Sequence, residues 1–286
     1  MAPRTVGQAL DAARTRLLES GVETSDADYL LCTALSLDRG RLLTRRGEVL
    51  PAEAAARFDG WIDRRACREP AQYITACQEF HGLSFRVDSR ALVPRPETEG
   101  LVDAALSFDL EPGASVADFG TGSGCVAIAI AVRRPDLRVF GLDRSPDALA
   151  LAAENVERHR VGDRVALRAG SFADPPPEWR GRLDAIVSNP PYVREDDWER
   201  LEPEITRYEP VDALVSGPTG YEAYEALAPV ASDWLAPGGR LALEFGYGQA
   251  REVRRIVASA GFDAIEVQRD LRGIERILTG SRGTHA

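Results

Sequence analysis

The chain has 286 residues, of which 44% are hydrophobic, and this length allows a large domain together with a smaller one. The formal charge is −10, and the excess of acids falls in residues 78–286, which carry 34 Asp and Glu against 24 Arg. Nucleic-acid affinity depends mainly on neutralising phosphates, so this balance argues against a protein that stays bound to a polyanion. No apolar run is long enough to span a membrane and no signal-like segment opens the chain, so we expect a cytoplasmic protein.

The few cysteines and histidines offer no metal site. Cys32, Cys67, Cys77 and Cys125 form no CxxC pair, and three histidines in all cannot complete a zinc ligand set. We therefore expect reduced thiols and no metal.

Residues 1–77 show the periodicity of helices throughout, which predicts a small helical bundle domain. Apolar residues recur three and four positions apart, with Gly or Pro at the breaks, in residues 6–21, 26–37 and 51–70. In residues 78–94 the period changes to alternation around Gly82, which predicts a β-hairpin linker between two domains.

Residues 95–286 alternate strand and helix patterns. Strands are predicted at residues 114–120, 137–143, 163–170, 183–192, 239–246, 262–270 and 274–280, and helices at 124–135, 145–159, 221–235 and 249–261. Such alternation predicts an α/β domain with a mostly parallel sheet, helices on both faces, and ligands at the carboxyl ends of the strands.

A glycine-rich loop, DFGTGSGC, follows the first of these strands. Glycines allow a tight turn and a close approach of ligand to backbone, and the next helix presents its N-terminal N–H groups. The loop also satisfies the permissive dinucleotide pattern G-x-G-x-x-G/A, so alone it does not separate NAD from S-adenosylmethionine. The loop residues expected to bind a cofactor are Gly120, Thr121, Gly122, Ser123 and Gly124.

Two acids near this loop bear on which cofactor it binds. Asp118 precedes the glycines, where it can meet the positive amino group of a methionine moiety, whereas a pyrophosphate would be repelled by a carboxylate. Asp143 ends the second strand, where it can accept the ribose hydroxyls of either cofactor. Asp118 therefore favours S-adenosylmethionine, and Asp143 does not discriminate.

The stretch SNPPY ends the predicted strand 183–192. Pro190 and Pro191 have no N–H for a ladder, which leaves the Asn189 side-chain oxygen and the Pro190 carbonyl as free acceptors. Two acceptors suit a planar NH₂ group, and the Tyr192 ring can stack on a flat amide or base. This stretch predicts a catalytic site for methyl transfer to an amide or aryl amine nitrogen.

The sequence closely resembles the HemK/PrmC family, the peptide chain release factor N5-glutamine methyltransferases. The resemblance covers nearly the whole chain and rests on EPAQYI (69–74), LVPRPETE (92–99), DFGTGSG (118–124), VSNPPY (187–192), LAPGGRLALEFGYGQ (235–249) and DLRGIERIL (270–278). NPPY alone is shared with other amino-group methyltransferases, whereas RPETE with a helical N-terminal domain is far more specific.

The resemblance implies a class I, Rossmann-like fold of seven strands, with S-adenosyl-L-methionine as donor and S-adenosyl-L-homocysteine as product. The implied acceptor is the glutamine of the GGQ motif in bacterial class I release factors, methylated on its side-chain nitrogen, which modulates translation termination. Residues 1–77 would then recognise the release factor, and residues 95–286 would form the methyltransferase domain. We expect a monomer with no stable nucleic-acid or membrane partner.

The resemblance also assigns residues beyond the two motifs. Asn189 to Tyr192 would bind the glutamine amide, with Asn189 also beside the cofactor. Arg95, Glu97 and Glu99 of RPETE would organise the site or contact substrate, and a salt-linked interdomain hinge is an equal alternative.

One departure from the family concerns the end of the third strand. Members often have an acid there followed by a bulky residue, whereas this chain has Gly170, Ser171 and Phe172. The acid that would bind the adenine amino group is missing, which leaves that contact to backbone groups, to Ser171 or to Asp174.

Four other functions compete with this one. A DNA adenine N6-methyltransferase would use the same NPPY on a flipped base, but the chain lacks a basic stripe and a long recognition insertion. A methyltransferase acting on a ribosomal-protein glutamine differs at the stretch that corresponds to RPETE. A non-catalytic cofactor-binding module would not need NPPY, and an NAD-dependent oxidoreductase would need an acid/base partner that is not evident.

Overall fold

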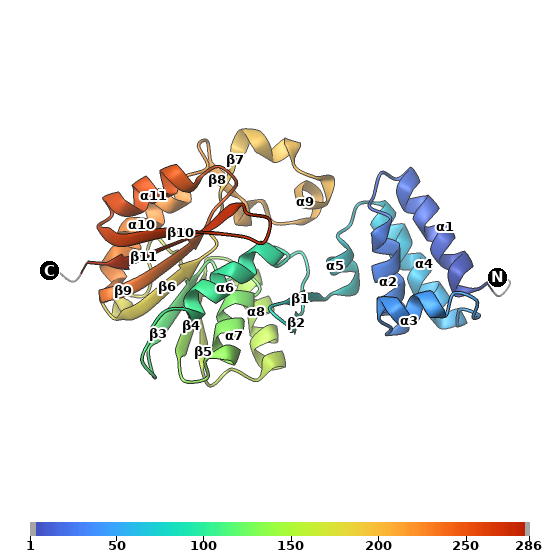
Figure 1. Ribbon diagram of the computed structural model, residues 1–286, viewed down its shortest axis with the longest axis horizontal. Helices are drawn as coiled ribbons and strands as arrows, with labels where there is room; N and C mark the ends of the chain where they lie inside the picture. Colours follow the sequence, from blue (N-terminus) through green and yellow to red (C-terminus); the bar gives the residue numbers. More distant parts are fainter. Residues whose placement is uncertain (1–3, 284–286) are drawn as a thin grey trace. The chain divides into compact units, whose positions relative to one another are not determined.

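The computed structural model describes residues 4–283, and the chain forms two compact units (Figure 1). One unit comprises the chain up to Cys77 together with Glu202–Tyr208, and the other comprises Gln78–Leu201 and the chain from Glu209 onward. The predicted division kept all of residues 95–286 in one domain, and the short helix α9 (Pro203–Tyr208) departs from it. The reason is a long-range ion pair that no local pattern reveals.

The N-terminal unit is a helical bundle. Its helices are α1 (Val6–Glu19), α2 (Ser25–Leu35), α3 (Arg39–Thr44), α4 (Ala52–Ala66) and α5 (Ala71–Thr75), joined by α9. A capping box of Thr5 and Gln8 begins α1. Arg65 is only 5% exposed and binds Asp26 over 2.7 Å and Glu204 of α9 over 2.9 Å, which fixes α9 to this unit.

The predicted hairpin is present but shorter than predicted. Strands β1 (Gln78–Phe80) and β2 (Leu83–Phe85) pair across a two-residue turn in which His81 and Gly82 have φ angles of 52° and 74°. Two positive φ angles are what a type I′ hairpin turn requires. From residue 86 to the prolines at 94 and 96 the chain forms no strand.

The larger unit is built on a seven-stranded sheet in the order β10-β11-β9-β6-β3-β4-β5 (Figure 1). Its strands are β3 (Ser115–Phe119), β4 (Arg138–Asp143), β5 (Val165–Ala169), β6 (Leu183–Ser188), β9 (Leu235–Glu244), β10 (Phe262–Arg269) and β11 (Glu275–Arg282). Only β11 runs antiparallel to its neighbours, β9 and β10. The predicted seven-stranded, mostly parallel sheet is therefore confirmed.

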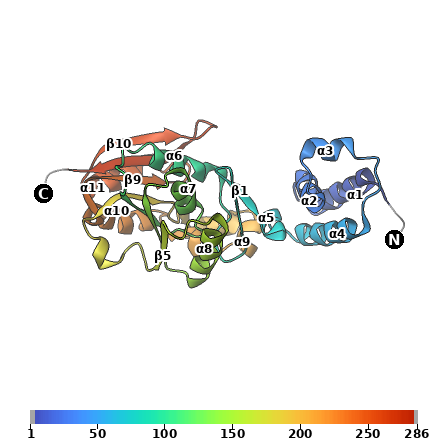
Figure 2. The same ribbon diagram turned by 90° about the horizontal axis from the view of Figure 1, so that it is seen from below.

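Helices cover both faces of this sheet (Figures 1 and 2). One layer contains α6 (Glu99–Leu106), α7 (Cys125–Arg133) and α8 (Pro146–His159), and the other contains α10 (Glu222–Trp234) and α11 (Ala250–Ser259). The sequence pattern did not reveal α6, which is a single short helix of eight residues. A two-stranded ribbon of β7 (Val193–Arg194) and β8 (Val215–Gly217) completes the unit.

The parallel topology brings five strand ends to one edge. β3, β4, β5, β6 and β9 run in the same direction, so their last residues, Phe119, Asp143, Ala169, Ser188 and Glu244, all lie at the carboxyl edge of the sheet. Ligands of such sheets bind at this edge.

Candidate active site

The glycine loop joins β3 to α7 at the carboxyl edge. Gly120, Gly122 and Gly124 have φ angles of 76°, 54° and 81°, a backbone region that side chains rarely adopt. The Gly120 N–H donates to the Leu142 carbonyl over 2.8 Å, which ties the loop to β4. A Cβ on Gly124 would lie 3.2 Å from the Cβ of Ala152, so this glycine allows α7 to pack closely on α8.

Asp118 lies in β3 and is 2% exposed. Its Oδ2 accepts hydrogen bonds from the Thr121 hydroxyl at 2.7 Å and the Ala127 N–H at 3.2 Å. Burial raises the pKa of Asp118 to about 7, against the opposing effect of these two hydrogen bonds. A cation bound beside Asp118 would favour its ionised form.

Asp143 ends β4 and faces the loop. Its Oδ2 accepts from the Gly122 N–H at 2.8 Å, and its Oδ1 accepts from the Ser145 N–H at 2.9 Å. Each carboxylate oxygen has a further lone pair, so Asp143 can still accept hydroxyl groups of a ligand. The same side chain therefore shapes the loop and offers acceptors to the cavity.

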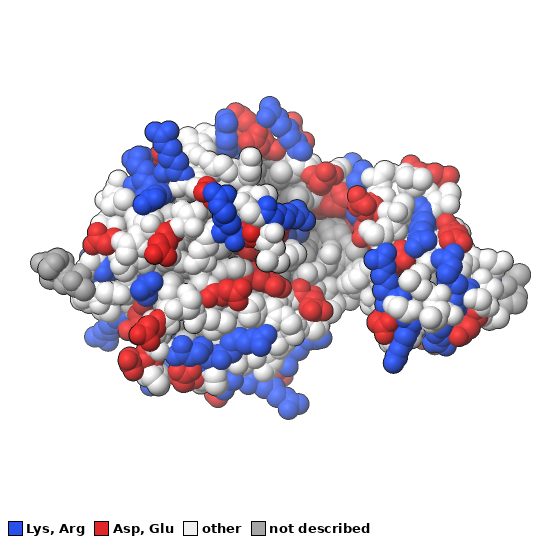
Figure 3. Space-filling view, viewed as in Figure 1, with Lys and Arg blue, Asp and Glu red and all other residues white. Residues whose placement is uncertain are grey.

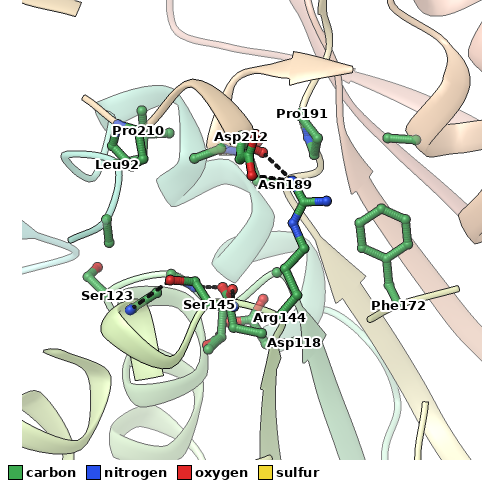
Figure 4. Close-up of a pocket in the computed structure, with 18 of the residues that line it drawn as sticks. Leu92, Asp118, Ser123, Arg144, Ser145, Phe172, Asn189, Pro191, Pro210 and Asp212 are labelled. Carbon is green, nitrogen blue, oxygen red and sulfur yellow. Dashed lines mark hydrogen bonds and ion pairs between the residues drawn. The ribbon is translucent and has the colours of Figure 1, made fainter. Parts of the chain in front are cut away.

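A cavity of about 940 Å³ lies along this edge, and every residue that lines it belongs to the larger unit (Figure 4). The predicted site residues that line it are Arg95, Asp118, Gly120, Thr121, Gly122, Ser123, Asp143, Ser171, Phe172, Asn189 and Pro191. The predicted residues that are not part of its lining, in the described chain, are Glu97, Glu99, Gly124, Pro190 and Tyr192. The fold thus brings the two predicted halves of the site, the glycine loop and the SNPPY stretch, to one cavity.

Asn189 directly follows β6 and lies at the cavity (Figure 4). Its Nδ2 donates to the Oγ1 of Thr98 over 3.2 Å, and Thr98 is only 4% exposed. With the amide nitrogen engaged in this bond, the Oδ1 of Asn189 is the atom left to accept an N–H from a ligand.

Tyr192 is half-buried and is not among the described residues that line the cavity. Its backbone N–H donates to the Leu214 carbonyl over 3.0 Å, and its ring is so close to Gly246 that a Cβ there would lie 3.0 Å from Cδ2. Burial raises the pKa of Tyr192 to about 12. The ring therefore packs on the sheet core, and its stacking on a substrate amide stays a prediction.

The charged residues of RPETE divide between two places. Arg95 lines the cavity and its Nη2 binds the Oε1 of Glu209 over 2.6 Å, while Glu209 is 7% exposed and also accepts the Val93 N–H. Glu99 instead accepts the His81 N–H over 2.7 Å, which ties α6 to the hairpin. One carboxylate oxygen of Glu99 is thus engaged with the hairpin, and a direct substrate contact by Glu99 stays a prediction.

The wall near Ser171 and Phe172 carries an ion pair that the sequence did not suggest. Arg144, directly after Asp143, binds Asp212 over 3.1 Å, and Figure 4 shows the extended Arg144 side chain reaching Asp212. The side chains are 61% and 78% exposed, so the pair is a solvated one. Asp174, a candidate for the missing acid, is not among the described residues that line the cavity.

Glu244, at the end of β9, is a second buried acid near the site that the sequence analysis missed. It is 2% exposed, and burial raises its pKa to about 7, while Thr98 and Asn189 act to lower it. An acid that interrupts the apolar run LALEFG was the signal that could have revealed it.

The described residues contain no cluster of His, Cys, Asp and Glu that could bind a metal ion. Within residues 4–283 there is also no helix that is both long and apolar enough to cross a membrane.

Comparison with known proteins identifies relatives of both units. The family model for the PrmC N-terminal domain matches residues 8–75, and that for the methyltransferase small domain matches residues 103–204. A release factor glutamine methyltransferase of Geobacter sulfurreducens is 42% identical over 98% of this chain and 97% of its own. Another, of Cereibacter sphaeroides, is 43% identical over 95% of this chain and 96% of its own.

Among solved structures, a methyltransferase from Pyrococcus furiosus superimposes with a TM-score of 0.51 at 20% identity, over 71% of this chain and 90% of that chain. At this identity the likeness concerns the fold alone. The full-length similarity to the curated enzymes is much stronger, and by it the chain belongs to the release factor glutamine methyltransferase family.

Proposed function

We propose that this protein transfers a methyl group from S-adenosylmethionine to the side-chain amide nitrogen of the GGQ glutamine in bacterial class I release factors. The observation that carries this proposal is the orientation of Asn189. Its nitrogen is bound to Thr98 and its oxygen is left for an N–H donor at the cavity. The family of the chain supports the same acceptor.

The donor set of the cavity fits S-adenosylmethionine. Asp118 would meet the ammonium of the methionine moiety, Asp143 would accept the ribose hydroxyls, and the wall at Phe172 would receive the adenine. When bound, this donor supplies a methyl group on a positively charged sulfur. The buried carboxylate of Asp118 suits a cationic ligand better than a pyrophosphate, which disfavours a dinucleotide.

Asn189 and Pro190 would act on the acceptor amide. An amide nitrogen is a poor nucleophile because its lone pair is delocalised. By accepting its two N–H bonds, the Asn189 Oδ1 and the Pro190 carbonyl would direct the lone pair toward the methyl group and stabilise positive charge as it develops on nitrogen. No strong base is needed, since the methylated nitrogen loses its proton readily.

The decisive experiment is mass spectrometry of recombinant release factor incubated with the protein and the donor. We expect a gain of one methyl group on the GGQ glutamine and none when that glutamine is replaced by alanine. An unmodified release factor, under conditions where the donor binds, would contradict the proposed function.

DNA provides the matched negative substrate, since NPPY also occurs in adenine methyltransferases. Figure 3 shows acidic and basic side chains intermixed over the face it presents, and acids exceed arginines in residues 78–286. Methylation of adenine in duplex DNA at a rate comparable with release factor would favour the alternative.

We also propose that residues 1–77 recognise the release factor, because none of the described residues of this unit lines the cavity. A chain shortened to begin at Gln78 should bind donor normally and methylate release factor poorly. It should also carry Glu204→Gln, since removal of Arg65 and Arg68 would leave that carboxylate without its ion pairs. Equal kcat/KM for shortened and full-length protein would contradict this role.

A further inference from the structure

Glu244 has no part in the function described so far, yet it interacts with Thr98 and with Asn189, which lines the cavity. It is 2% exposed, and its Oε2 has no hydrogen-bond partner among the described residues. A buried carboxylate without full pairing is costly, and such groups tend to occur where they serve a function.

Thr98 interacts with both Asn189 and Glu244, and the Asn189 side chain also hydrogen-bonds to the Glu244 carboxylate. The Thr98 Oγ1 accepts the Asn189 amide over 3.2 Å, so its own proton is free to be donated to another group. Thr98 also interacts with the Glu244 carboxylate and favours its ionised form. The three side chains come from η1 (Pro96–Thr98), the end of β6 and the end of β9.

A hydroxyl is an ambiguous partner for an amide, because it can accept from the nitrogen or donate to the oxygen. An ionised carboxylate can only accept. If the Thr98 hydroxyl donates its proton to Glu244, the Thr98 oxygen can only accept a hydrogen bond from Asn189. In the flipped orientation of the Asn189 amide, its oxygen would face Thr98 and find no donor there, while its NH₂ would face the NH₂ of the substrate.

We propose that Thr98 and Glu244 are positioning residues that fix the side-chain amide of Asn189 with its oxygen toward the acceptor substrate. The proposal rests on the proposed function for its consequence in catalysis, whereas the orientation itself can be measured without turnover. It assigns a role to the threonine of RPETE, which sequence reasoning passed over in favour of the three charged residues.

The kinetic test uses Thr98→Val, which keeps the shape and removes both hydrogen bonds. We expect kcat on release factor to fall roughly tenfold to a hundredfold, with donor affinity unchanged. Thr98→Ser restores the hydroxyl and should recover most of the rate. Thr279→Val is the matched control, since Thr279 is also 4% exposed but lies on β11, and kcat should not change.

A double-mutant cycle separates positioning from general damage. In an Asn189→Ala background, Thr98→Val and Glu244→Gln should each cost less than about threefold further in kcat, because the amide they orient is gone. Losses that multiply with that of Asn189→Ala would overturn the proposal.

A direct readout is the Asn189 side-chain amide signal in ¹⁵N-labelled protein, assigned by its absence from Asn189→Ala. It should shift in Thr98→Val and in Glu244→Gln, and in the unaltered protein it should titrate near the Glu244 pKa of about 7. The charged and titratable groups facing Glu244 are Arg276 on β11, Glu97 on η1, Cys125 on α7, Tyr224 on α10 and Tyr192.

Burial raises the pKa of Cys125 and of Tyr192 to about 12 and that of Tyr224 well above its usual range, so these three do not titrate near pH 7. Glu97→Gln therefore serves as the control for the remaining acid and should leave the titration in place, whereas Glu244→Gln should abolish it.

The two proposals fail in different ways. A shifted and titrating Asn189 signal without methylation of release factor would contradict the proposed function and leave the positioning intact. If release factor is methylated but the Asn189 signal has the same chemical shift in Thr98→Val and in Glu244→Gln, the positioning is overturned and the function stands.

Discussion

The donor side and the acceptor side of the cavity are built in different ways. On the donor side the hydrogen bonds are local: Asp118 binds Thr121 three residues away, and Asp143 binds Gly122 across 21 residues. On the acceptor side, Asn189 binds Thr98 across 91 residues, and Arg95 binds Glu209 across 114. A short sequence motif can therefore predict the donor side, whereas the acceptor side depends on segments that only the fold brings together.

The strongest test of this contrast is Asn189→Ala. Loss of one preorganised acceptor costs roughly 2.7–4 kcal/mol, or about a hundredfold to a thousandfold in kcat. Donor affinity, measured by calorimetry, should barely change, because the Asn189 amide oxygen is assigned to the acceptor. A near wild-type rate in single-turnover methylation would mean that SNPPY only terminates a strand.

Glu244→Gln tests the buried acid of the acceptor side through stability. The folded-state pKa of Glu244 is raised to about 7. As pH rises from the unfolded-state pKa to this value, the unfolded chain ionises while the folded protein keeps the proton, so the free energy of unfolding falls. Above pH 7 the variant should be more stable than the unaltered protein by up to about 3 kcal/mol, and equal to it below about pH 4.5. Urea unfolding at both ends of this range measures it, and a pH-independent difference would contradict the assignment.

On the donor side, Asp143→Ala should weaken donor affinity roughly tenfold to a hundredfold, from the loss of charge-assisted bonds worth about 1.5–3 kcal/mol. The variant also removes the hydrogen bond from the Gly122 N–H, so part of the lost affinity comes from a less well-ordered glycine loop. Asp163→Ala removes an exposed acid that pairs with its neighbour Arg164; it is the control and should have no effect. If the donor affinity of Asp143→Ala is unchanged in calorimetry, Asp143 only supports the glycine loop and does not bind the donor.

A smaller effect is expected at Asp118: binding of the donor should release a proton from its carboxyl group. In the free protein its pKa is about 7, so near pH 6.5 most Asp118 carboxyls are protonated. A bound ammonium lowers that pKa, and a fraction of a proton should leave per donor bound. Calorimetry in buffers of different ionisation enthalpy measures the fraction, and Asp118→Asn should abolish it. Proton release unaltered in that variant would place the ammonium elsewhere.

The smallest effect is expected for the exposed pair on the cavity wall. Arg144 and Asp212 are solvated, so Arg144→Ala should change donor affinity by less than about fivefold, as for a surface pair worth at most ~1 kcal/mol. A much larger, salt-dependent loss would show that Arg144 contacts the donor itself.

Residue patterns within short stretches of the chain were enough to predict several parts of this protein. Apolar runs and helical periodicity located the seven strands of the sheet and most of its helices, because central strands are buried on both faces and each helix buries one. The glycine loop, Asp118, Asp143 and the SNPPY stretch were found because glycines, an acid and prolines at strand ends have few structural reasons to occur there.

The distant groups that complete the acceptor side could be identified from the three-dimensional fold and not from the order of residues. Thr98, Glu209 and Glu244 follow no local spacing, and they meet the cavity residues because parallel strands end at one edge and η1 packs beside them. The fold also shows that Glu204 belongs with Arg65 in the helical unit, and an ion pair between residues 139 positions apart leaves no pattern in the sequence. Charge pairing and burial depend on spatial neighbours, and the order of residues along the chain does not specify these directly.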